Sequence, residues 1–156
     1  MENLQQKAAF LRSDFTKQLA MLDADAPRKW GVMSVQQMIE HMSDYVRIAN
    51  GRAPMEIITP AENIERMQGF LASEKPMREN TPNPLLPDEP PPVRHATKEA
   101  AIAELQGEID HFFEVFTTTP DKQLNNPFFG VLNYDLQVQL LYKHSTHHLR
   151  QFGIAV

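Results

Sequence analysis

The sequence contains no cysteine. This absence excludes disulfide bonds, thiolate metal ligands, iron–sulfur clusters and a cysteine nucleophile. Any metal site in this chain must therefore use nitrogen or oxygen ligands, from histidine, aspartate or glutamate.

Long apolar runs and clusters of basic residues are also missing. No stretch approaches the ~20 apolar residues of a membrane-spanning helix, and the first residues lack the basic-then-apolar pattern of a secretory signal. The formal net charge is −5, and the 15 lysines and arginines are spread along the chain. We therefore expect a cytoplasmic protein that binds neither nucleic acid nor membranes.

Helical periodicity is what the sequence does show. The length of 156 residues is that of one ordinary domain, so we expect a single domain over residues 1–156. Apolar residues recur at steps of three and four in four long segments. The predicted helices cover residues 4–22, 34–49, 97–116 and 133 onward, with a short one from Pro60 to about Leu71. We expect Ser34 to form a capping box with Gln37, Thr59 and Asn133 to cap their helices, and residues 126–130 to lie in a loop. No stretch of comparable length alternates as a strand would, which predicts an all-α fold.

Proline divides the chain between its second and third long helices. Seven of the twelve prolines fall between Pro76 and Pro92, and this composition cannot continue a helix or an interior strand. We expect an extended segment that covers one end of the helices. Four long helices with one long connection predict a four-helix bundle in which the second and third helices run parallel.

Three of the six histidines lie within five residues, between His144 and His148. At about 100° per residue, His144 and His148 stand on one helix face, one turn apart. His41 lies inside the apolar stripe of the second helix and therefore points into the core as well. Burying three imidazoles without a shared partner is costly, so this set predicts a divalent metal site with ligands His41, His144 and His148.

His147 is the alternative ligand to His148. The spacing of four residues favours His148, which leaves His147 as a supporting group or a general acid or base. We expect His95 and His111 to lie at the surface. Asp44, Tyr45 and Gln151 follow the predicted ligands at three or four residues, and each is a candidate to bond a ligand ring.

Two segments resemble a known family. They are Trp30-Gly31-Val32-Met33-Ser34-Val35-Gln36-Gln37-Met38-Ile39-Glu40-His41-Met42 and the stretch from Pro127-Phe128-Phe129-Gly130 through Lys143-His144-Ser145-Thr146-His147-His148-Leu149-Arg150-Gln151-Phe152-Gly153. Both are similar to the DinB-like superfamily of metal-dependent four-helix-bundle proteins, and most similar to one of its bacterial branches.

The resemblance implies an up-down-down-up bundle with a long middle crossover and a three-ligand metal site. The family's first ligand matches His41, and the other two match His144 and His148. Similar members bind nickel, zinc or related divalent ions, and many form dimers. The usual family ending His-His-Arg-Gly-Gln differs here, because Arg150 is displaced by one residue, so the resemblance does not assign a thiol-binding role to Arg150.

These observations leave two functional hypotheses and one metal-free alternative. The first is a metalloenzyme that activates water or a small thiol, as a hydrolase or a thiol-dependent transferase, with zinc or nickel ahead of iron or manganese and His147 as the candidate catalytic base. The second is a non-catalytic stress or binding protein with a structural metal. In the third, a metal-free interaction module, Tyr45, Gln151 and backbone groups satisfy the three histidines.

Overall fold

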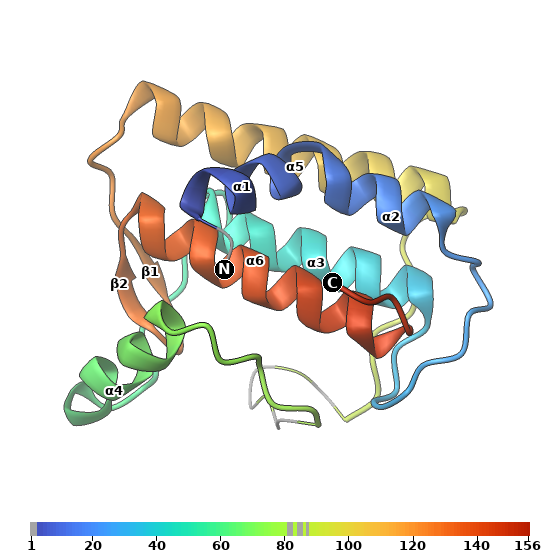
Figure 1. Ribbon diagram of the computed structural model, residues 1–156, viewed down its shortest axis with the longest axis horizontal. Coiled ribbons are helices and arrows are strands. Elements are labelled where there is room, and N and C mark those ends of the chain that lie inside the picture. Colours follow the sequence, from blue (N-terminus) through green and yellow to red (C-terminus); the bar gives the residue numbers. More distant parts are fainter. Residues whose placement is uncertain (1–2, 81–82, 84–85, 87) are drawn as a thin grey trace.

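The computed structural model describes residues 3–80, 83, 86 and 88–156 (Figure 1). Within these residues the chain is mostly helical, with five helices, the first made of α1, η1 and α2 without a break, and one small two-stranded sheet. The elements are α1 (Leu4–Ala9), η1 (Phe10–Asp14), α2 (Phe15–Met21), α3 (Val35–Ala49), α4 (Ala61–Ala72), α5 (Lys98–Thr118), β1 (Leu124–Asn126), β2 (Gly130–Leu132) and α6 (Tyr134–Gln151). None of the described helices is long and apolar enough to cross a membrane.

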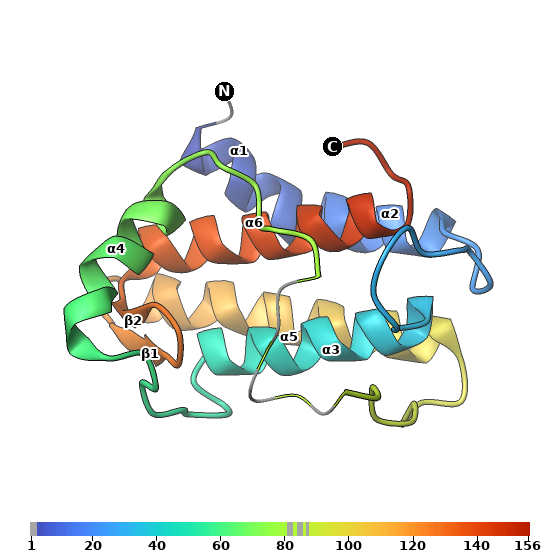
Figure 2. The ribbon, with the colours of Figure 1, turned by 90° about the horizontal axis from the view of Figure 1, so that it is seen from below.

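The first helix is continuous from α1 to α2, as its apolar periodicity predicted. Asn3 caps it with a reciprocal capping box to Gln6. Its middle turn, η1, is π-helical, which the sequence did not indicate. In Figure 2, α1, α2 and α6 form one layer and α3 and α5 form the other. The interior between these layers is apolar, and fully buried side chains include Phe15, Leu19, Met38, Met42, Leu105, Ile109, Phe112 and Leu140.

Ser34 begins α3 with the predicted capping box. Its hydroxyl accepts the backbone N–H of Gln37, and the Gln37 side chain accepts the backbone N–H of Ser34. The helix ends at Ala49, and Gly51 follows with φ of +87°, the left-handed conformation that glycine adopts without strain.

The start of α4 differs from its prediction. Thr59 was expected to cap the helix, but α4 begins at Ala61 after Pro60, and no side chain caps it. The hydroxyl of Thr59 instead donates to the carbonyl of Phe128, 2.8 Å away. A tertiary contact therefore takes the group that the sequence assigned to a local cap.

A short hairpin occupies the segment that the sequence predicted as a loop. Strands β1 and β2 are antiparallel, with Asn126 opposite Gly130. Asn126 accepts the backbone N–H groups of Phe128 and Phe129 and so closes the turn. Gly130 has φ of +83°, and a Cβ there would lie 3.0 Å from Ile64. The hairpin corrects the all-α expectation, because strands of three residues are too short to show alternation.

The segment between α3 and α5 is held at both ends by the helices that carry the clustered histidines. On α6, the Gln139 amide donates to the carbonyl of Ser73 at 2.9 Å, and the Lys143 ammonium donates to that of Lys75. On α3, the Glu40 carboxylate accepts the backbone N–H of Arg94 at 2.7 Å. The extended, polyproline-like conformation predicted from Pro76 to Pro92 falls partly on residues 81–82, 84–85 and 87, outside the described residues.

Candidate metal centre

Three histidine rings from two helices meet in the core. His41 comes from α3, and His144 and His148 come from α6. The Nε2 atom of His144 lies 3.1 Å from Nε2 of His41 and 2.9 Å from Nε2 of His148. In the part of the chain that the structure describes, these three form the one group of His, Asp or Glu side chains close enough to share a metal ion.

Tyr45 supports the ring of His144. The two rings meet edge to face with centroids 4.2 Å apart, and Tyr45 is itself buried. The Tyr45 hydroxyl accepts a hydrogen bond from the Asn126 side chain at 3.2 Å, so β1 helps to position it. Tyr45 therefore contacts a candidate ligand through its ring rather than through the hydrogen bond expected from the sequence.

Gln151 fixes the tautomer of His148. The Gln151 Nε2 group donates to the carbonyl of Trp30 at 2.9 Å, which directs Oε1 toward Nδ1 of His148 at 2.8 Å. Because Oε1 only accepts, Nδ1 of His148 carries the proton, and in the neutral ring Nε2 presents its lone pair to the cluster. Gly31 leaves the space for this bond, since a Cβ there would lie 2.6 Å from Nε2 of Gln151.

Burial keeps the three imidazoles neutral. Desolvation lowers the pKa of His41 to about 4; the Asp44 carboxylate opposes this shift and His147 adds to it. Desolvation also lowers the pKa of His144 and of His148 well below the ordinary value, and the neighbouring histidines lower both further. Neutral imidazole is the form that binds a metal ion, so the site needs little deprotonation near pH 7.

The cluster is not satisfied by its own hydrogen bonds. The Nε2 atom of His144 carries either one hydrogen or one lone pair, so it can bond only one of the two Nε2 atoms beside it. The Nδ1 atom of His144 is buried and has no partner among the described residues. A cation between the rings would satisfy all three Nε2 lone pairs at once.

The spacing of the rings also suits a divalent transition ion. With metal–nitrogen bonds of about 2.0–2.1 Å, ligands separated by about 90–110° would place their nitrogens roughly 2.8–3.4 Å apart. The two Nε2 separations from His144, 3.1 and 2.9 Å, fall in this range. Imidazole nitrogen is a ligand for zinc, nickel, copper and iron, and the set therefore leaves the identity of the metal open.

Comparison with known proteins agrees with this geometry. A family model described as the DinB superfamily matches residues 9–152. The chain belongs to the DinB superfamily. The match includes α3 and α6 and therefore all three clustered histidines. No curated protein and no solved structure gives a match.

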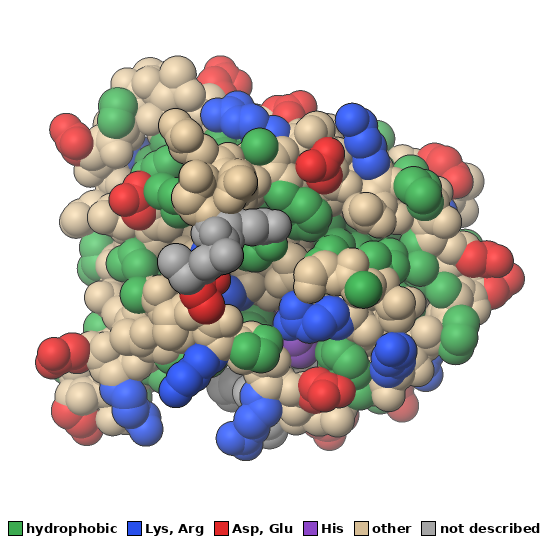
Figure 3. Space-filling view, viewed as in Figure 1, with side chains coloured by type: hydrophobic (Ala, Val, Ile, Leu, Met, Phe, Trp, Pro, Cys, Tyr) green, Lys and Arg blue, Asp and Glu red, His purple; other side chains and the backbone are tan. Residues whose placement is uncertain are grey.

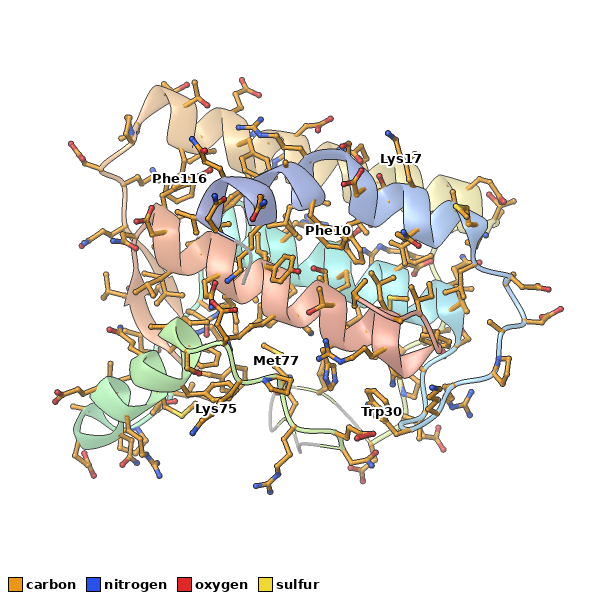
Figure 4. All side chains as sticks on the ribbon, viewed as in Figure 1. Phe10, Lys17, Trp30, Lys75, Met77 and Phe116 are labelled. Carbon is orange, nitrogen blue, oxygen red and sulfur yellow. The ribbon has the colours of Figure 1, made fainter. Side chains whose placement is uncertain are left out.

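His147 lies beside the cluster in this DinB-superfamily chain, but outside it. Its ring packs on Trp30 with centroids 5.3 Å apart and lies near the backbone of Met77. Both contacts lie below α6 in Figure 4. Burial and the nearby Arg150 lower the pKa of His147, and the backbone of Met77 opposes this shift. The Nδ1 atom of His147 is buried and has no hydrogen-bond partner among the described residues. The placement leaves His148, not His147, with the other two rings.

Other predicted groups have partners elsewhere. Asp44 forms an ion pair with Arg94 at 3.0 Å, so it does not bond a ligand ring. His95 is partly covered and lies 3.3 Å from a carboxylate oxygen of Glu104, rather than at the open surface. His111 is half-buried on α5. On the face drawn in Figure 3, histidine shows only as a small patch between basic and apolar side chains.

Trp30 is the residue that the sequence reading missed. It holds Gln151 through its carbonyl and His147 through its ring. It precedes α3 in a connection without helical periodicity, so no pattern placed it beside the last helix. Two signals were available, its single occurrence in the chain and its place at the start of a segment that resembles the family, and neither assigned it a role.

Replacing Gln151 with leucine is expected to weaken metal binding by about 10- to 100-fold, as loss of a group that orients a ligand histidine usually does. The substitution removes the acceptor for Nδ1 of His148 and frees the ring to adopt the other tautomer. Affinity would be measured by competition with a chromophoric chelator.

Two further variants separate this effect from a general loss of packing. Gln151→Glu keeps an acceptor for His148 and loses the donor to Trp30, so it should retain more affinity than Gln151→Leu. Gln18→Leu, on α2 and without a hydrogen bond to the cluster, should bind as the parent does. Equal affinity in the parent and in Gln151→Leu would contradict the role of Gln151.

Proposed function

We propose that this protein is a metalloenzyme in which His41, His144 and His148 hold a divalent transition ion, zinc or nickel ahead of iron or manganese. The ion would activate a water molecule or a small thiol for attack on an electrophile, as in a hydrolase or a thiol-dependent transferase. The observation that supports the proposal is that three histidines, within the described residues, lie close enough together to share one metal ion. Three protein ligands leave positions for water or substrate, whereas structural sites are usually closed by four.

The surrounding residues have separate tasks in this proposal. Gln151 holds His148 in the tautomer that presents Nε2, and Tyr45 supports the ring of His144. Trp30 covers His147 and limits the access of water on that side. His147 is neutral near pH 7 because of its lowered pKa, so its free Nδ1 can accept a proton from a nucleophile that reaches it.

The order and direction of the helices are also part of this proposal. We infer an up-down-down-up four-helix bundle with residues 52–96 as the crossover. In its support, α3 and α5 pack together and both run from right to left in Figure 1, while the first helix and α6 run the opposite way. A single domain, a cytoplasmic location, a small-molecule substrate and a homodimer stay predictions.

The test begins with protein purified without an affinity tag. Elemental analysis should find about one divalent transition ion per chain, and His41→Ala should lose it. The metal-free protein, reloaded with zinc, nickel, iron(II) or manganese, would then be assayed for hydrolysis of activated esters and amides and for transfer of small thiols to an electrophile.

The outcomes distinguish the hypotheses. Metal-dependent turnover that His41→Ala abolishes would support the enzyme. Bound metal without turnover, together with a sharp fall in melting temperature on chelation, would favour a structural metal instead. Unchanged metal content in His41→Ala would contradict the site itself.

A further inference from the structure

A second polar pocket lies on a different face of α6 from His144 and His148. It has a volume of about 170 Å³ and lies between α6 and residues 74–76. Its lining includes Glu74, Lys75, Gln139, Lys143, Thr146 and Arg150. At about 30 Å³ per water molecule, the space suffices for a few waters or one small oxyanion.

The charges around this pocket do not balance. Glu74 is the carboxylate side chain in the lining, and it is already paired with the buried Lys7, whose Nζ lies 2.8 and 3.0 Å from its oxygens. Lys75, Lys143 and Arg150 have no ion-pair partner among the described residues. Three cations without an ion-pair partner among the described residues therefore line one pocket, beside the paired Glu74 and the last residue, Val156.

Lys143 is the least ordinary of these cations because it is only 6% exposed. Its ammonium donates to the carbonyl of Lys75 and lies 4.7 Å from the centre of the Phe70 ring. Neither contact supplies a negative charge, so the ammonium is buried without an ion-pair partner among the described residues. A buried cation of this kind is stabilised by an anion that replaces its lost hydration.

Two of the donors are also arranged in advance. Gln139 is fixed by bonds to Lys7 and Ser73, and Lys143 is fixed by its bond to Lys75. The Lys143 ammonium has three N–H groups and uses one on that carbonyl, and the guanidinium of Arg150 has a fork of donors that matches an oxyanion. Ligand binding would therefore order the side chains of Lys75 and Arg150 but not those of Gln139 and Lys143.

We propose that this pocket binds a small tetrahedral oxyanion of the phosphate or sulfate type, either as the free ion or as a group on a larger molecule. A dianion fits the three uncompensated positive charges better than a monocarboxylate does. This inference concerns the outer face of α6 and does not rest on the proposed metal chemistry.

The test is calorimetric titration of chelator-treated protein with inorganic phosphate, sulfate, methyl phosphate and acetate, at constant ionic strength set with chloride. Chelation prevents the anions from binding a metal ion. Phosphate and sulfate should bind at one site and at least about tenfold more tightly than acetate. Tighter binding of methyl phosphate than of phosphate would identify a group on a larger molecule, and the reverse would identify the free ion.

Matched variants make the result specific. Lys143→Met keeps the length and the contact with Phe70, and it should weaken phosphate binding at least about tenfold; Arg150→Gln should weaken it as well. Lys17→Met is the control, because Lys17 lies on α2, well away from Lys75 in Figure 4. His144→Ala should leave phosphate binding unchanged, which separates this site from the metal centre. The proposal would be overturned if Lys143→Met bound phosphate as tightly as the parent does, or if Lys17→Met weakened binding as much as Lys143→Met. It would also be overturned if titration with phosphate gave no more heat than titration with chloride.

Discussion

His144→Ala is expected to lose at least about 100-fold in affinity for zinc or nickel. His144 is the ring whose Nε2 contacts both of the others, at 3.1 and 2.9 Å, so its removal leaves two nitrogens from different helices. Binding energies of about 10–16 kcal/mol for structural zinc assign roughly 3–4 kcal/mol to each ligand, which corresponds to more than 100-fold. Protein purified without a tag should contain little metal, and competition with a chelator gives the loss in affinity.

The matched control is His111→Ala. It removes a half-buried histidine on α5 that belongs to no cluster in the described structure, and it should leave metal content unchanged. Circular dichroism at neutral pH should show the same helix content in both variants. Full metal content in His144→Ala would contradict the assignment, and loss in both variants would point to a general defect in folding.

The metal-free protein is expected to lose stability steeply as the pH falls from about 6.5 towards 4. In the unfolded chain the histidines bind protons below their ordinary pKa of 6.5, whereas burial lowers the pKa of folded His41 to about 4 and the pKa of His144 and of His148 well below the ordinary value. The unfolded state therefore binds more protons in this window. In this window each of the three histidines lowers the free energy of unfolding by up to about 1.4 kcal/mol per pH unit. Its full contribution to stability is present only above pH 6.5.

Urea unfolding of chelator-treated protein at pH 7.5, 6.5, 5.5 and 5 would measure this dependence. His144→Ala has one fewer buried imidazole and should show a shallower slope. Glu40, Glu74 and Glu104 have pKa values lowered from 4.5, so their contributions are lost only at lower pH and do not mimic the effect. A stability that is constant from pH 6.5 to 5 would contradict the neutral, buried cluster.

Helix prediction succeeded where the signal was long and local. The stripes of α3, α5 and α6 repeat over several turns, and Ser34 and Asn133 cap their helices as expected. Prediction was wrong where a few residues or a distant contact decided the outcome. The β1–β2 hairpin is too short for periodicity, and Thr59 bonds Phe128 instead of capping α4.

The same division applies to the metal centre. Helical spacing placed His144 and His148 on one face, and the apolar stripe of α3 turned His41 inward, so the three rings were predicted as a set. Asp44, three residues after His41, was a candidate to hydrogen-bond a ligand ring, but it pairs with Arg94, 50 residues away in the chain. Spacing along one helix cannot show which partner a side chain will find on a segment that is distant in the sequence.

The sequence by itself determined the helices and the family and indicated which histidines to consider, because each of these depends on residue type and spacing along the chain. Only the tertiary structure decided that His147 turns to Trp30 and Met77 while His148 joins the other rings. It also decided that Gln151 fixes the His148 tautomer, since the carbonyl that orients Gln151 comes from Trp30, 121 residues away. These choices depend on how α3, α6 and the connection before α3 pack together, and no local pattern in the chain encodes that packing.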